Sequence, residues 1–140
     1  KIKQQSFFLV AWFCDFMNLW YYDILRYSNG VWNQIDNPTS YDLNSVFFMN
    51  EYEGWIAGNE GTILHSLDGG ETWTLQSSGT SETLLDIFFT SPSNGYAVGT
   101  NGTILHYTQL SNIKNPEGQN ESFYLMQNNP NPFQTKTNIK

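Results

Sequence analysis

The chain has 140 residues, about the length of one ordinary domain. Aromatic residues make up 16% of it and charged residues 14%, a balance typical of strand-rich folds with packed faces. The formal net charge is −7, and no Lys or Arg lies between Tyr27 and Ile113. Because nucleic acids and anionic membrane surfaces are bound through cationic side chains, we expect neither as a partner. The single cysteine, Cys14, excludes an internal disulfide.

Residues 1–23 are the least informative part of the sequence. An apolar run, Ser6–Cys14, follows Lys1 and Lys3, as in a secretory signal, but no small-residue cleavage site follows it. The run is much shorter than the roughly 20 residues that cross a membrane, so we expect no membrane insertion. Three interpretations stay open: a degenerate copy of the repeat described next, a signal remnant, or a reading-frame artefact.

An internal repeat begins at Ile24. Trp32 lies 41 residues before Trp73. Three further blocks recur at the same offset: Leu43–Phe48 as Leu84–Phe89, Gly54–Gly58 as Gly95–Gly99, and Gly61–His65 as Gly102–His106. Independent blocks that share one offset indicate a repeated structural unit.

Each repeat divides into short strands separated by turn residues. In the complete copy we predict four strands and a hairpin turn in which Gly61 takes a positive φ; the strands are Leu43–Met49, Gly54–Gly58, Thr62–Ser66 and Thr72–Ser77. Ile24–Trp32 resembles a third strand, a turn and a fourth strand, whereas the last copy ends at Thr108 without a fourth strand.

Four strands in about 41 residues are typical of a β-propeller blade. The sequence therefore predicts an all-β fold in residues 24–108, a partial β-propeller of two to three four-stranded antiparallel blades. So few blades cannot close a ring alone, so self-association is an expectation too.

A polar turn joins the last two strands of the complete repeat. Gly69 and Gly70 tolerate a positive φ, and short polar side chains can bond to the turn backbone. The fixed residues match the pattern Ser-x-Asp-x-Gly-x-Thr-Trp of the Asp-box, the bacterial neuraminidase repeat: Ser66, Asp68, Gly70, Thr72 and Trp73. This resemblance implies a structural corner between the outer strands of a blade, away from any catalytic centre.

A wider resemblance covers residues 24–108. The blocks Gly54–Gly58, Gly61–Leu64 and Ser66–Trp73 are similar to the repeats of photosystem II assembly factor propellers and their secreted bacterial relatives. The resemblance implies a protein-binding scaffold, and it supplies no catalytic residues that could be assigned to this chain. The basic patches of the photosynthetic members have no counterpart between Tyr27 and Ile113.

The last part of the chain has a different composition. Residues 109–122 are polar and typical of a linker. Residues 123–140 resemble the truncated start of a type IX secretion C-terminal sorting domain, with matches at Leu125, Gln127, Asn128, Pro130, Asn131, Pro132 and Phe133; Asn129 stands where that family prefers Tyr. The resemblance implies a secreted or cell-surface parent protein, on the extracellular side of a Gram-negative-type envelope.

The side chains that could bind a metal or take part in catalysis do not form a recognisable site in the sequence. His65 and His106 occupy equivalent positions in successive repeats, so we expect strand-surface histidines rather than a metal pair. Asp68 and Asp86 could supply the paired carboxylates of a glycosidase, but one belongs to the turn and the other to a strand. A sialidase needs an arginine clasp, and Arg26 is the one arginine. We expect no catalytic, cofactor or metal site.

Two hypotheses for function remain. The favoured one is a non-enzymatic binding or structural module of a secreted β-propeller protein, with an unidentified protein or glycan partner. The alternative is a fragment of a glycan-active propeller enzyme whose catalytic residues lie outside this chain.

Overall fold

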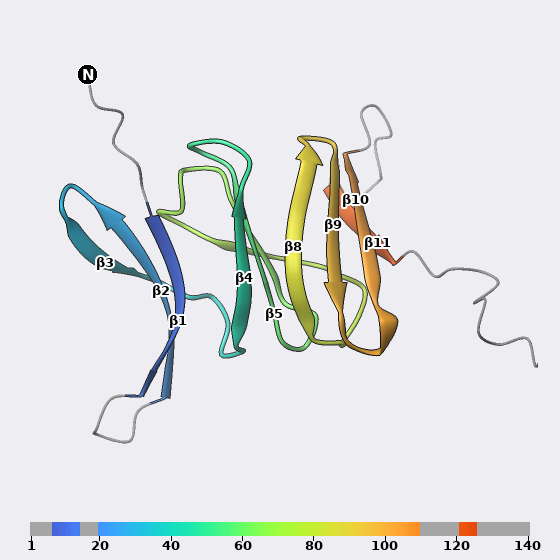
Figure 1. The fold of residues 1–140 in the computed structure, drawn as a ribbon, viewed down its shortest axis with the longest axis horizontal. Helices are drawn as coiled ribbons and strands as arrows, with labels where there is room; N and C mark the ends of the chain where they lie inside the picture. The colour runs from blue at the N-terminus through green and yellow to red at the C-terminus, as the bar shows by residue number, and fades with distance from the viewer. Residues whose placement is uncertain (1–6, 15–19, 110–120, 126–140) are drawn as a thin grey trace, which may run out of the picture.

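The computed structural model describes residues 7–14, 20–109 and 121–125, with side chains from residue 24 to residue 108. These residues form three antiparallel sheets that follow one another along the longest axis of the molecule, and they contain no α-helix (Figure 1). None of the sheets closes on itself. The prediction of an all-β fold made of unclosed propeller blades is confirmed.

The first sheet has three strands in the order β1 (Phe7–Cys14), β2 (Trp20–Ser28) and β3 (Val31–Ile35). Asn29 and Gly30 connect β2 to β3 with φ values of 54° and 84°. Positive φ at both central residues is the requirement of a tight two-residue hairpin, and Asn-Gly is its preferred sequence. The predicted strand, turn and strand are present here.

The second sheet has four strands in chain order: β4 (Leu43–Phe48), β5 (Gly54–Gly58), β6 (Ile63–Ser66) and β7 (Thr74–Gln76). The bounds lie within two residues of the predicted ones. Gly61, in the turn between β5 and β6, has a φ of 66°, as predicted.

The third sheet has the order β11-β10-β9-β8, formed by β8 (Leu84–Ser91), β9 (Asn94–Gly99), β10 (Ile104–Gln109) and β11 (Glu121–Leu125). A 3₁₀ turn, Thr100–Gly102, connects β9 to β10. The prediction that this repeat lacks a fourth strand is wrong, because β11 pairs along β10. The offset of 41 could not reveal this strand, because its sequence does not repeat the block that forms β7.

Strand β5 is buried along its whole length because sheets cover both of its faces. Side chains alternate across a strand, so neighbouring residues belong to different cores. Trp55 and Ala57 join the core shared with the third sheet, which also holds Ile63, Leu84, Ile87, Phe89, Ala97, Leu105 and Tyr107. Ile56 joins the core shared with the first sheet, which also holds Ile24, Leu43, Leu64 and Trp73.

Aromatic rings form the centre of the core between the second and third sheets. The Trp55 ring centroid lies 5.2 Å from that of Phe89 and 5.1 Å from that of Tyr107. Such ring pairs stabilise by about 0.5–1.5 kcal/mol beyond the burial of their surface. At the edge of this core, the Ser45 hydroxyl donates to Asp86 Oδ1 (2.6 Å) and the Asn44 side-chain amide donates to the Leu84 carbonyl (2.8 Å).

Gly54 and Gly95, near the start of β5 and β9, allow a phenylalanine ring to pack directly against the strand backbone. An ideal Cβ on Gly54 would overlap the ring of Phe48, and one on Gly95 would overlap the ring of Phe89. Both pairs occupy equivalent positions in the repeat, so this close approach explains why glycine recurs there.

Two substitutions in one strand test the role of the inter-sheet core. Ile87 is 1% exposed and Leu85 is 53% exposed, although both lie in β8. We expect Ile87→Ala to lower the free energy of unfolding by about 2–5 kcal/mol, because it leaves a cavity between the sheets. Leu85→Ala should change it by less than about 0.5 kcal/mol. Urea unfolding followed by tryptophan fluorescence measures both; equal losses would contradict the proposed packing.

Candidate functional site

The Ser66–Trp73 turn is closed by side chains that bond to its own backbone. The Ser66 hydroxyl donates to Asp68 Oδ1 (2.8 Å) and accepts the N–H of Gly70 (2.8 Å). Asp68 Oδ1 also accepts the N–H groups of Glu71 (3.0 Å) and Thr72 (2.9 Å), while Oδ2 accepts the Thr72 hydroxyl (2.6 Å). One carboxylate therefore satisfies several donors of the turn.

These bonds set the charge state of Asp68. Burial raises the pKa of this carboxyl, but the hydrogen bonds from Thr72, Ser66 and Glu71 favour the ionised form and lower the pKa from 3.8 to about 2. Asp68 is thus a stable anion near neutral pH. A carboxyl that gives up its proton so readily is a poor general acid.

The turn is anchored to two sheets. Trp73 is buried in the core between the first and second sheets, where its ring meets Phe48 edge-on at 5.9 Å. The Gly69 N–H donates to the carbonyl of Tyr52 (2.7 Å). From β2, Arg26 Nη1 donates to Glu71 Oε1 (3.2 Å), so the sole arginine of the chain is already paired with a carboxylate.

The two histidines differ in environment. His65 is buried and stacks on Trp55 at 3.6 Å, so the expectation of a strand-surface histidine is wrong for it: the third sheet covers this face of β6. Its Nε2 lies 3.2 Å from Glu53 Oε1, and burial raises the pKa of Glu53. His106 is half-buried, and its Nε2 lies 2.6 Å from Asn94 Oδ1.

Each histidine therefore pairs with a residue of its own repeat, Glu53 directly before β5 and Asn94 at the start of β9. The partner lies twelve positions earlier in both repeats, a spacing that is visible in the sequence. Within residues 7–14, 20–109 and 121–125, no three His, Cys, Asp or Glu side chains gather as metal ligands would. Of the residues that resemble a sorting motif, Leu125 ends β11, and those from Gln127 to Phe133 lie outside the described residues.

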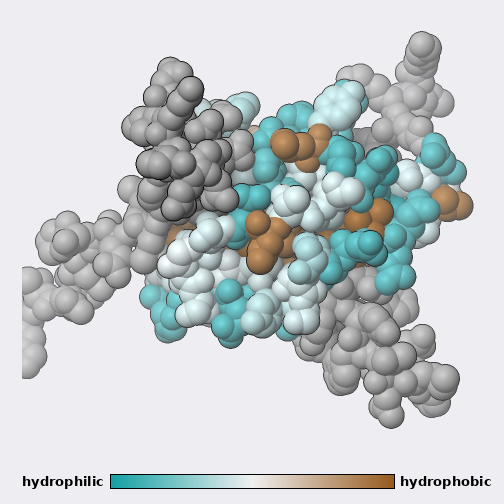
Figure 2. All heavy atoms as spheres, turned by 180° about the vertical axis from the view of Figure 1, so that it is seen from behind, coloured by the Kyte–Doolittle hydropathy of each residue, from teal (hydrophilic) through white to brown (hydrophobic). Residues whose placement is uncertain are grey.

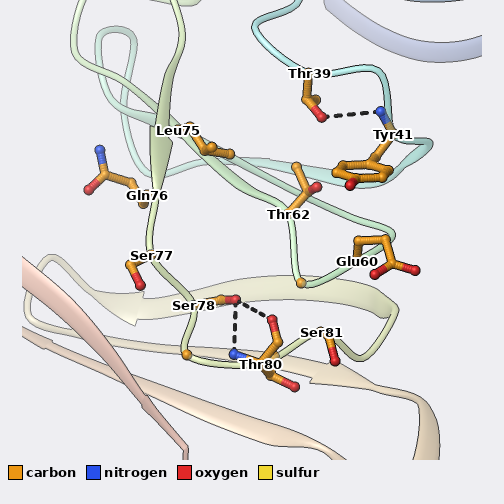
Figure 3. A pocket seen from close by; sticks show the side chains of 12 residues that line it. Thr39, Tyr41, Glu60, Thr62, Leu75, Gln76, Ser77, Ser78, Thr80 and Ser81 are labelled. Carbon is orange, nitrogen blue, oxygen red and sulfur yellow. Dashed lines mark hydrogen bonds between the residues drawn. The ribbon is translucent and has the colours of Figure 1, made fainter.

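A solvent-open groove lies where the loops of the second sheet meet the connection to the third (Figure 3). Its volume is about 440 Å³. Its walls come from the loop before β4, the β5–β6 turn, β7 and the loop after β7. The lining residues include Thr39, Tyr41, Glu60, Thr62, Leu75 and Ser81. Figure 3 shows the Tyr41 ring and the Leu75 side chain on different walls of the groove.

The groove floor is held by close backbone packing. Gly61 donates its N–H to the Glu82 carbonyl (2.9 Å), and a Cβ at Gly61 would overlap the Thr80 carbonyl. The Ser78 hydroxyl donates to the same Thr80 carbonyl at 3.2 Å. The sequence does not reveal this groove because its residues come from three loops and β7, and their only shared signal is the polar composition of the loops.

The face of the molecule opposite to the view of Figure 1 is of mixed polarity. Figure 2 shows separate hydrophobic residues among polar and neutral ones on the side opposite to that of Figure 1. No helix in the described part of the chain is long and apolar enough to cross a membrane.

Comparison with known families agrees with this architecture. The family model described as photosynthesis system II assembly factor YCF48 matches residues 26–108, more than half of the chain. The chain belongs to this family. The match runs from within β2 into β10, so it includes the Ser66–Trp73 turn, the groove and the buried residues of both inter-sheet cores of the YCF48-family chain except Ile24.

Three curated proteins of the YCF48 family share short segments with this chain. It is 32% identical over 50 residues to the photosystem II assembly protein Ycf48 of Synechococcus sp. strain JA-3-3Ab and 33% identical over 42 residues to that of Thermosynechococcus vestitus. It is 45% identical over 47 residues to the photosystem II assembly lipoprotein Ycf48 of Synechococcus sp. strain CC9902.

These matches cover 30–34% of this chain and 12–15% of the relatives' own length. The chain thus corresponds to a small part of each relative. No solved structure matches it.

Replacing Asp68 tests the hydrogen-bonded turn. Its pKa is depressed in the folded chain, so its contribution to stability is complete above about pH 5 and is lost as the pH falls toward about 2. We expect Asp68→Asn to lower the free energy of unfolding at pH 7 by about 1 kcal/mol, a modest value because the carboxylate is exposed to solvent.

Urea unfolding at several pH values measures this effect. The Asp68→Asn variant should lose less stability than the parent chain on acidification, whereas Asp36→Asn, at an exposed carboxylate outside the turn, should follow the parent. Parallel acid curves for all three proteins would contradict a role for the Asp68 anion in stability.

Proposed function

We propose that this chain is a non-enzymatic, protein-binding segment of a β-propeller of the YCF48 family. The family match over residues 26–108 carries the proposal, because the relatives in that family are named assembly proteins. Assembly requires a rigid surface that recognises another protein, and loops on a packed propeller scaffold supply such a surface.

The groove beside the second sheet is the surface that we assign to this role. Tyr41 and Leu75 are exposed large hydrophobic side chains on its walls, and Thr39, Thr62 and Ser81 add hydroxyl-bearing side chains to its lining. An apolar anchor surrounded by hydrogen-bonding groups suits an extended polypeptide segment. Glu60 adds a negative charge, which favours a neutral or basic segment.

The Ser66–Trp73 turn has a structural role in this proposal. Its resemblance to the Asp-box and the low pKa of Asp68 support a corner that holds β6 to β7 rather than a catalytic acid. The glycan-active alternative would need a raised pKa on one of two facing carboxylates.

We further propose that the parent protein is exported. One relative is named a lipoprotein, and residues 123–140 resemble the start of a secretion sorting domain. Within the proposal, residues 24–108 are the propeller segment, residues 109–122 the connection and residues 123–140 the sorting region, although β11 brings residues 121–125 into the third sheet.

Binding arrays test the groove. We expect the purified chain to select peptides, and Tyr41→Ala to weaken that binding about tenfold or more, because it removes the exposed ring from the groove wall. Tyr52→Ala is the matched control, since Tyr52 is 62% exposed against 48% for Tyr41 and lies outside the groove.

The same preparations distinguish the alternatives. Selection of glycans in place of peptides, lost in Tyr41→Ala, would replace the protein partner by a carbohydrate. Hydrolysis of chromogenic glycosides that a single Asp or Glu substitution abolishes would overturn the non-enzymatic proposal.

A further inference from the structure

Three turns between neighbouring strands share one backbone conformation but differ in their first central residue. Both central residues have a positive φ in each turn: Asn29 and Gly30, Glu60 and Gly61, and Asn101 and Gly102. In the second and third sheets, a backbone hydrogen bond of 3.0 Å also joins the residues that flank the central pair. These features are typical of a tight turn of type I′.

Glu60 is the unusual residue of this set. In the left-handed conformation the Cβ atom lies close to the neighbouring backbone, and besides glycine only the short polar residues Asn and Asp adopt it readily. The other two turns have Asn at this position, whereas Glu60 has a φ of 53°. Because backbone strain of this kind concentrates at functional sites, the strained turn indicates a role for the Glu60 side chain outside the turn itself.

The Glu60 carboxylate is not used inside the fold. Neither a hydrogen bond nor an ion pair connects it to the part of the chain that the structure describes. By contrast, Glu82 accepts hydrogen bonds from the Thr100 hydroxyl and the Asn101 side-chain amide, each at 2.8 Å. The side chain at the equivalent turn position of the third sheet thus stabilises the fold, while that of Glu60 is exposed on the groove wall.

The groove adds an aromatic ring to this carboxylate. Figure 3 shows Glu60 and the Tyr41 ring on the same side of the groove, with Leu75 on the other. Tyr41 is 48% exposed, and its backbone N–H donates to Thr39 Oγ1 at 3.1 Å, which orders the loop that carries the ring. A carboxylate and an exposed ring on one wall suit a guanidinium group, because this group can bond to the first and stack on the second.

The groove has no cation of its own. None of its lining residues is a Lys or Arg, and the sequence contains neither type between Tyr27 and Ile113. The one arginine of the chain, Arg26, is paired with Glu71 in the Ser66–Trp73 turn. Charge complementarity therefore favours a partner that brings the cation into the groove.

We propose that Glu60 selects the partner segment of the groove by binding an arginine side chain, whose guanidinium group lies against the Tyr41 ring. An apolar residue near that arginine contacts Leu75 on the other wall. This inference rests on the proposed peptide-binding function of the groove, and it makes Glu60 the residue that determines which segments bind. The strained turn is the cost of placing a carboxylate at this position.

Matched synthetic peptides test the inference. One set contains a leucine and an arginine at varied separation in a Gly/Ser background, and the second set has citrulline, a neutral analogue, in place of arginine. All ends are acetylated or amidated, so that charge comes from the side chain alone. Fluorescence anisotropy at low salt should give dissociation constants about fivefold or more lower for the arginine peptides, and high salt should reduce the difference by screening.

Removing the charge of Glu60 should remove this preference. We expect Glu60→Gln to bind arginine peptides as weakly as citrulline peptides, while its binding of citrulline peptides stays equal to that of the parent chain. Glu51→Gln is the matched control, because Glu51 is an exposed carboxylate outside the groove, and it should keep the full preference.

A second substitution separates the strain from the charge. Glu60→Asn gives the turn the residue type found in the two equivalent turns, so the urea midpoint should rise, with a roughly fivefold larger ratio of folded to unfolded chain. The same variant should lose the preference for arginine. Higher stability together with lost selection is the result expected of a residue that serves binding at the expense of the fold.

The outcomes distinguish this inference from the proposed function on which it rests. If the parent chain selects no peptide, or if Tyr41→Ala binds peptides as the parent does, the groove function fails and the role of Glu60 fails with it. If the parent selects peptides through Tyr41 but binds arginine and citrulline peptides equally, or if Glu60→Gln keeps the preference, the role of Glu60 alone is wrong. A Glu60→Asn variant less stable than the parent contradicts the strain in the turn.

Discussion

Sheet-on-sheet packing is the constraint on which the rest of this structure depends. The second sheet has two apolar faces, since Ile56 and Leu64 point to one neighbouring sheet while Trp55 and Ile63 point to the other. A sheet of this kind cannot leave both faces in water without exposing its aromatic residues, so its strands become stable through their neighbours. The complete burial of β5 and the partial burial of β9, which have equivalent sequences, follow from the number of neighbours each sheet has.

The polar features of the chain are arranged around these cores. The Ser66–Trp73 turn places Trp73 between two sheets while Asp68 satisfies the donors of the turn, so its carboxylate is committed to backbone groups. His65 is enclosed because Trp55 and Glu53 occupy its two sides, and the same combination recurs as Tyr96, His106 and Asn94 in the third sheet. Aspartate and histidine often take part in catalysis, but in this structure Asp68 and His65 stabilise a turn and a core.

The groove arises from the same architecture. The turn at Gly61 lies against the backbone at Thr80, where the second sheet leads into the third, and the loop that contains Tyr41 borders the same groove as β7.

The sequence alone determined the repeat and the four strands of the complete sheet, because an offset shared by several blocks and glycines at turns are local properties of the chain. It could not assign β11, whose residues lie outside the repeated pattern, or the burial of His65, which the sequence predicted to lie on a surface. It also could not reveal the groove or the pairing of Arg26 with Glu71, which join loops and strands far apart in the chain. Those features were decided by tertiary structure, because identical residue patterns become core or surface according to whether another sheet lies against them.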